Sequence, residues 1–167
     1  MEDFRQYVSF HKNVHEGNWD FANQFLSSHP KAVSAKISIR EDTALHIAVC
    51  GGHMNIVKEL VNKMSEENLK IKNKVGFTVL GFCAKIGNIE IAKCIIGKSP
   101  TLLSIGNGNM KIIPVVLAIK NNPNAIDMVR YLYDETPKED LVPTKGVNGA
   151  TFVTQCIYVK AFGNNFY

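Results

Sequence analysis

Apolar residues recur along the chain in pairs of short segments, separated by small or turn-forming residues. In three of these pairs, the second segment carries apolar side chains at spacings of three and four, which places them on one face of a helix. The three stripes are Ile56, Val57, Leu60, Val61 and Met64, then Ile89, Ile91, Ala92, Ile95 and Ile96, then Ile126, Val129, Leu132 and Tyr133. The pattern predicts an all-α chain built from helix–turn–helix pairs.

The pairs repeat at a fixed interval. The first segment of a pair begins at Thr43, at Thr78 and at Ile113, which are 35 residues apart. The same interval relates the residues that follow this segment, namely Gly17, Gly52, Gly87 and Asn122. Glycine and asparagine adopt the left-handed conformation that ends many helices, so each is expected to separate the two helices of a pair.

Neither helix of a pair can bury its stripe alone, so we expect the pairs to stack into one elongated domain over residues 1–167. The turn-forming segments 40–42, 73–76 and 106–109 would join neighbouring units as β-turns or hairpin loops. The predicted units are residues 4–38, 39–72, 73–107 and 108–145, with an incomplete terminal unit at 146–167.

Residues 43–48 read Thr-Ala-Leu-His-Ile-Ala, and Gly52 and His53 precede the segment Ile-Val-Lys-Glu-Leu at 56–60. This order of residues resembles the ankyrin repeat, with Ala44 where the family has proline. The resemblance predicts a solenoid of stacked helix–turn–helix units, in which the Thr43 hydroxyl and the His46 ring form local hydrogen bonds. It assigns structural motif roles to Thr43, Leu45, His46, Gly52, Thr78, Leu80, Gly87 and Pro114. The third unit departs from the motif because Gly81 replaces the histidine.

Three further segments, at 59–67, 102–108 and 129–133, are similar to a plant group of ankyrin proteins. Members of this group usually carry a C-terminal membrane domain, named for a Pro-Gly-Gly motif, and act in stress and defence signalling. That domain is absent from the sequence, and residues 159–167 depart from the pattern where a second helix should follow. The chain therefore resembles a truncated or alternatively ended member. The N-terminus lacks the basic start and apolar run of a secretory signal, which favours a cytoplasmic protein, membrane-associated where a longer form carries the membrane domain. The incomplete last unit leaves apolar residues uncovered and predicts self-association.

Composition narrows the classes of function. The chain is 46% hydrophobic and 20% charged, with a net charge of +4, so it has the composition of a folded globular domain. Basic residues are scattered from Arg5 to Lys160 without a cluster, which argues against nucleic acid as a partner. The longest apolar run, 112–119, is far shorter than the roughly 20 residues that span a bilayer. The four cysteines have no zinc or redox spacing and are interpreted as buried free thiols.

Catalytic and metal chemistry have weak signals. His11 and His15 lie four residues apart, as zinc ligands can, but no third ligand follows in a known motif. Residues 106–109 read Gly-Asn-Gly-Asn and lack the lysine and hydroxyl residue of a phosphate-binding loop, so a turn is favoured. The sequence therefore predicts a protein that is not an enzyme and has no cofactor and no metal site.

In ankyrin stacks, the turn tips and the exposed side of each first helix line one concave face. The repeat register assigns to this face Arg40, Asp42, Cys50, Gly51, Lys74, Val75, Phe77, Lys85, Ile86, Met110, Ile112, Lys120 and Asn121. Its apolar members with a basic rim predict a surface that binds a partner protein. Two alternatives stay open. Phe77, Met110 and Ile112 could pack down between adjacent turns. The repeat scaffold could also bind a small molecule or a metal, or carry the active site of an enzyme.

Overall fold

The computed structural model describes residues 4–121 and 126–162 and is all-α, with no extended strand in those two ranges. The α-helices are α1 (Val8–His15), α2 (Trp19–Ser28), α3 (Ala44–Gly51), α4 (Met54–Lys63), α5 (Glu66–Leu69), α6 (Val79–Ile86), α7 (Ile89–Lys98), α8 (Pro114–Asn121), α9 (Ile126–Glu135) and α10 (Val147–Phe162). Short 3₁₀ segments lie at Phe4–Tyr7, Pro30–Val33, Pro100–Ser104, Lys138–Leu141 and Pro143–Lys145.

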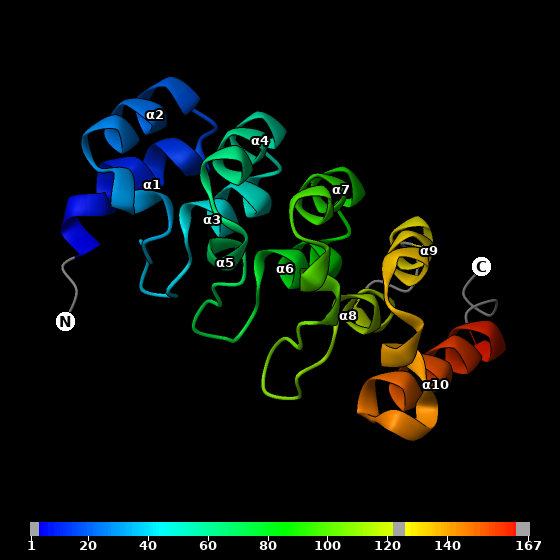
Figure 1. Cartoon of the computed structure of the whole chain (residues 1–167). Coiled ribbons are helices and arrows are strands. Elements are labelled where there is room, and N and C mark those ends of the chain that lie inside the picture. Colours follow the sequence, from blue (N-terminus) through cyan, green and yellow to red (C-terminus); the bar gives the residue numbers. More distant parts are fainter. Residues whose placement is uncertain (1–3, 122–125, 163–167) are drawn as a thin grey trace.

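The helices form two rows along one stack. Figure 1 shows α1, α3, α6 and α8 in one row and α2, α4, α7 and α9 in the other, with the loops before α3, α6 and α8 projecting on the same side. Each helix of the first row packs on the next helix of the same row. This arrangement is the predicted solenoid of stacked helix pairs.

The helices begin and end at the capping residues that the sequence predicts. Thr43 and Thr78 stand at the N-caps of α3 and α6, and Pro114 is the first residue of α8, where its missing N–H costs nothing. Gly52 and Gly87 follow α3 and α6 with φ of 70° and 89°, which confirms the left-handed helix ends. The predicted equivalent, Asn122, lies outside the described residues.

The core repeats with the units. The first-row helices α3, α6 and α8 are buried on most sides, and the second-row helices bury one stripe each. The buried part of the predicted stripes comprises Ile56, Val57, Leu60, Val61, Met64, Ile91, Ala92, Ile95, Ile96 and Leu132. In α9, Ile126 and Tyr133 are instead exposed, and Met128 is buried in their place, so the predicted stripe of this helix was partly wrong.

The last helix occupies the next place in the first row. α10 packs on α8, and its Phe152 ring stacks on Tyr133 of α9 at 5.5 Å between centroids. Asn148, near the start of α10, accepts a hydrogen bond from the backbone N–H of Ile113 at 3.1 Å. The terminal helix is therefore joined to the stack by packing and by a specific hydrogen bond.

The cysteines are less buried than expected. Cys83 is buried as expected, Cys94 is half-buried, and Cys50 and Cys156 are exposed, so the interpretation as buried thiols holds fully for Cys83 alone. All four are free. Burial raises the pKa of the Cys83 thiol well above its ordinary value, which keeps it protonated and unreactive. Among the described helices, none combines the length and the apolar character that a bilayer crossing requires.

Candidate binding groove

Three loops of the same design project from the stack. The loop before α3 is closed by the Ile37 N–H donating to Asp42 O at 2.8 Å, and the loop before α6 by Asn73 N–H donating to Phe77 O at 3.0 Å. In the loop before α8, Asn107 and Ile112 exchange two backbone bonds. The backbone turns through positive φ at Glu41, Gly76 and Lys111, again at the 35-residue interval.

The loops are bonded to one another as well as to themselves. The Lys74 N–H donates to Arg40 O at 2.9 Å, and the Gly108 N–H donates to Gly76 O at 2.9 Å. The Lys72 ammonium donates to Gly106 O at 2.6 Å. The three tips therefore form one continuous edge, which holds their side chains at fixed places along the stack.

His46 fixes the base of this edge. Its Nδ1 lies 2.9 Å from the Thr43 hydroxyl and accepts from the Thr43 N–H, which confirms the local bonds that the family resemblance implies. Its Nε2 lies 3.0 Å from Phe77 O in the next loop, a link between units that the resemblance did not supply. Both ring nitrogens of this buried histidine are thus engaged, which gives it a structural role.

Apolar side chains lie exposed along the loops and the first-row helices. A hollow of ≈ 500 Å³ lies between α1 and the first loop and is lined by Val8, His11, Ile37, Ser38, Ile39 and Arg40. The exposed apolar residues of this face are Val8 (62% exposed), Ile39 (80%), Val75 (52%), Ile86 (42%) and Met110 (64%). We call the face formed by the three loops and the helices α1, α3, α6 and α8 the groove.

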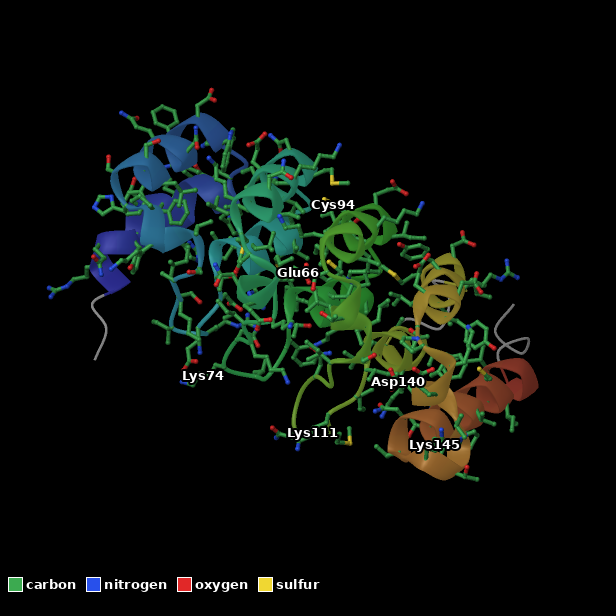
Figure 2. All side chains as sticks on the ribbon, in the orientation of Figure 1. Glu66, Lys74, Cys94, Lys111, Asp140 and Lys145 are labelled. Carbon is green, nitrogen blue, oxygen red and sulfur yellow. The ribbon has the colours of Figure 1, made fainter. Side chains whose placement is uncertain are left out.

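Most of the residues predicted for this face are exposed or half-buried. The exposed members are Arg40, Cys50, Gly51, Lys74, Val75, Lys85, Ile86, Met110, Lys120 and Asn121. Phe77 is half-buried, with the Lys85 ammonium 5.6 Å from its ring centroid. Asp42 is largely covered and bonds to Asn73 of the next loop at 2.8 Å. Figure 2 shows Lys74 and Lys111 at the ends of neighbouring loops.

Ile112 was assigned to the face wrongly. Its side chain is only 6% exposed and belongs to the core, because the backbone pairing with Asn107 turns it inward. Phe77 also follows in part the alternative of packing between turns, whereas Met110 does not. Sequence reasoning missed Val8, Ile39 and Lys111. Ile39 could have been found from the register, since it stands 35 residues before Lys74.

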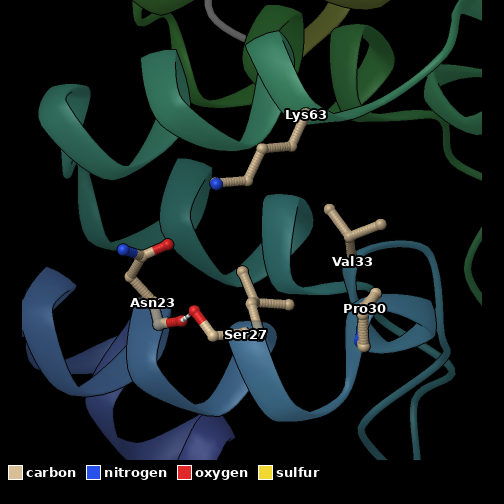
Figure 3. Close-up of a pocket in the computed structure, with 6 residues that line it drawn as sticks. Asn23, Ser27, Pro30, Val33 and Lys63 are labelled. Atoms are coloured by element: carbon tan, nitrogen blue, oxygen red, sulfur yellow. Dashed lines mark hydrogen bonds between the residues drawn. The ribbon is translucent and has the colours of Figure 1, made fainter.

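A second hollow, of ≈ 250 Å³, lies between α2 and α4. Figure 3 shows Asn23, Ser27, Pro30, Val33 and Lys63 around it. The Ser27 hydroxyl donates to the backbone of its own helix, at Asn23 O. Among the residues that line this hollow, Lys63 alone carries a charge. This hollow has no pair of titratable groups that acid–base chemistry would need.

The predicted metal candidates form no site with a third ligand. The His11 and His15 rings lie parallel with centroids 6.3 Å apart. Within residues 4–121 and 126–162, no three His, Cys, Asp or Glu side chains gather where they could hold a metal ion.

Stacked helix pairs with bonded loops define the class of helical repeat proteins. Residues 10–104 match the family described as ankyrin repeats (3 copies), and the chain belongs to the ankyrin repeat family. Ankyrin repeats generally serve as protein–protein interaction modules. No curated protein matches the chain significantly.

Proposed function

We propose that the chain is a non-catalytic module that binds a partner protein in the groove, through the loop tips and the first-row helices. The exposure of Val8, Ile39, Val75, Ile86 and Met110 along this one face carries the proposal. Apolar side chains that lie exposed together on one face are typical of a binding site, because their burial by a partner is favourable by about 25 cal/mol per Å².

The rigidity of the groove supports the proposal. The bonds between neighbouring loops fix the tips before a partner arrives, so little conformational entropy is lost on binding. Following the resemblance to plant ankyrin proteins, we place this activity in stress or defence signalling and in the cytoplasm. Association with a membrane would come through a longer form that carries the membrane domain.

The test is site-specific crosslinking in plant extract. A photoreactive amino acid replaces Val75, Met110 or, as a control, Phe21, which is at least as exposed as either but lies on α2. We expect one partner to be captured from both groove positions and not from position 21. The captured protein, once purified, should bind the wild-type chain and should lose affinity for Phe77→Ala. Capture from position 21 alone, or thermal stabilisation by a metabolite or metal instead of a protein, contradicts the proposal.

A second surface favours self-association. α10 exposes Val147, Val153, Ile157 and Tyr158, and no charged residue occurs from Gly146 to Val159. We infer that a second copy of the chain covers this helix, because two uncharged faces meet without desolvating a charge and extend the stacking of α6, α8 and α10.

A further inference from the structure

The groove changes character along the stack. In its second half, the segments 71–78 and 105–113 and the helices α6 and α8 contain no Asp or Glu. The same segments carry the lysines Lys72, Lys74, Lys85, Lys111 and Lys120, all exposed. Lys72 donates to a backbone carbonyl, and Lys85 lies over the Phe77 ring, so their positive charges are not neutralised by carboxylates.

The first half of the groove is different because its charges are paired. Glu41 forms an ion pair with Lys36, and Asp42 lies 4.0 Å from Arg40. The hydrogen bond and the charge of Lys36 lower the pKa of the Glu41 carboxyl, and Lys74 of the next loop adds a smaller effect in the same direction. Beside these pairs lies the hollow lined by Val8, Ile37 and Ile39.

We propose that the segment bound in the groove is an extended acidic stretch of a partner protein with regularly spaced apolar side chains. This inference rests on the function proposed above. The apolar side chains lie against Val8, Ile39, Val75, Ile86 and Met110, and the carboxylates lie among Lys74, Lys85, Lys111 and Lys120. Each exposed ion pair contributes little by itself, so the charges select and steer the partner, while apolar burial supplies most of the affinity.

The spacing of the recognised residues follows from the stack. Packed helices lie about 8–10 Å apart, and the bonds from Lys74 to Arg40 and from Gly108 to Gly76 keep the tips in step with them. A chain in the extended polyproline II conformation advances about 3.1 Å per residue and returns every third side chain to the same face. An apolar residue at about every third position therefore meets one unit after another, and the acidic residues fall between.

The residue types favour carboxylates over nucleic acid and over phosphate groups. The basic half contains lysine and no arginine, whereas bidentate binding of phosphate is typical of arginine. Its exposed apolar residues, Val75, Ile86 and Met110, are aliphatic, and single-stranded nucleic acid binds by stacking on aromatic rings.

The test selects ligands from a displayed library of random peptides about 12 residues long, enough to span four units at three residues each. Selection is made on the whole chain. Among the selected peptides, we call groove-dependent those whose binding is weakened by substitutions in the groove. We expect these peptides to be enriched in Asp and Glu, with apolar residues at intervals of three. Peptides without acidic enrichment, or no groove-dependent peptide at all, overturn the inference.

Charge-matched variants then locate the binding. Lys74→Gln combined with Lys85→Gln should weaken a selected peptide about tenfold and flatten its salt dependence. Lys58→Gln combined with Lys98→Gln removes the same charge from the second-row helices α4 and α7 and should leave affinity within about twofold. Thermal unfolding checks that both variants fold. Equal weakening by both pairs overturns the inference.

Three further probes separate the inference from the function on which it rests. These are a phosphorylated peptide of the same sequence with its acids replaced, a single-stranded oligonucleotide, and anionic vesicles. Preferred binding of any of them through Lys74 and Lys85 overturns the acidic-peptide inference. A non-acidic protein captured from positions 75 and 110 would overturn it too, while leaving the groove as a protein-binding site.

Discussion

The side chain of Asn107 occupies the space directly over Gly81, where a Cβ atom would collide with its amide oxygen. From this position, the Asn107 Oδ1 accepts hydrogen bonds from the Thr78 N–H at 2.7 Å and from the Thr78 hydroxyl at 2.9 Å. These are the groups that His46 serves for Thr43 in the preceding unit. The histidine missing from the third unit is therefore replaced by an asparagine from the next loop.

Because Asn107 fills the place of the missing histidine beside Gly81, mutations of Gly81 and Asn107 should have coupled effects on stability. Gly81→Ala should destabilise the fold by about 1–3 kcal/mol, because the added methyl displaces Asn107. Asn107→Ala should cost a similar amount, about 1–3 kcal/mol, since it leaves the buried Thr78 donors unpaired. With both changes, the loss should be clearly smaller than the sum, because the methyl no longer meets an amide. Urea unfolding of the four proteins measures the coupling, and strict additivity would show that the two residues act separately.

The stacked fold could be predicted from the sequence because its signals are local and repeat. Each helix has its stripe, its threonine cap or its glycine end within a few residues, and the 35-residue interval aligns them. The role of Asn107 could not be predicted in this way, since it acts on residues 26 and 29 positions earlier. Likewise, register alone placed Ile112 on the groove, whereas the pairing of its backbone with Asn107 decides that it is buried.

His46 should make stability depend on pH. Burial lowers the pKa of its ring, outweighing the opposite effect of the bond to Phe77 O. Because the pKa is lower in the folded chain, the unfolded chain binds more protons as the pH falls through about 6.5. The stabilisation is therefore complete above that pH and decreases below it, down to the folded pKa.

The variant His46→Gln tests this directly. This change should lower the free energy of unfolding by about 1–3 kcal/mol at pH 7.5, because the ring forms hydrogen bonds within two units. It should also reduce the dependence of the free energy of unfolding on pH between pH 6.5 and 5. His11→Gln is the control. Burial and the charge of His15 also lower the pKa of His11, but this histidine is only half-buried and lies on α1. Urea unfolding at several pH values gives both slopes. An unchanged slope in His46→Gln would assign the pH dependence to other groups.

Lys111 holds a conformation that suits glycine better. Its φ is 52°, at the position where the preceding loop has Gly76. A side chain costs about 1–2 kcal/mol in this region, and glycine loses about 0.5–1 kcal/mol in entropy, so Lys111→Gly should stabilise by roughly 0.5–1 kcal/mol. Met110→Gly, one residue earlier and without positive φ, should destabilise slightly. Thermal unfolding compares the two, and equal effects would mean that residue 111 is not strained.

The exposed face of α10 predicts a concentration-dependent oligomer. Val153 and Ile157 lie four residues apart on this helix and are both exposed, so a lysine at either position would introduce a charge into the contact with a second copy. Val153→Lys and Ile157→Lys should each shift the protein to the monomer in sedimentation velocity over a wide range of concentration. Phe21→Lys places the same charge on an exposed apolar site of α2 and should leave association unchanged. The folded stability of all three variants should stay within about 0.5 kcal/mol of wild type, because none of these side chains is buried. A wild-type chain that remains monomeric at every concentration, or an oligomer that only Phe21→Lys dissociates, would show that α10 does not mediate self-association.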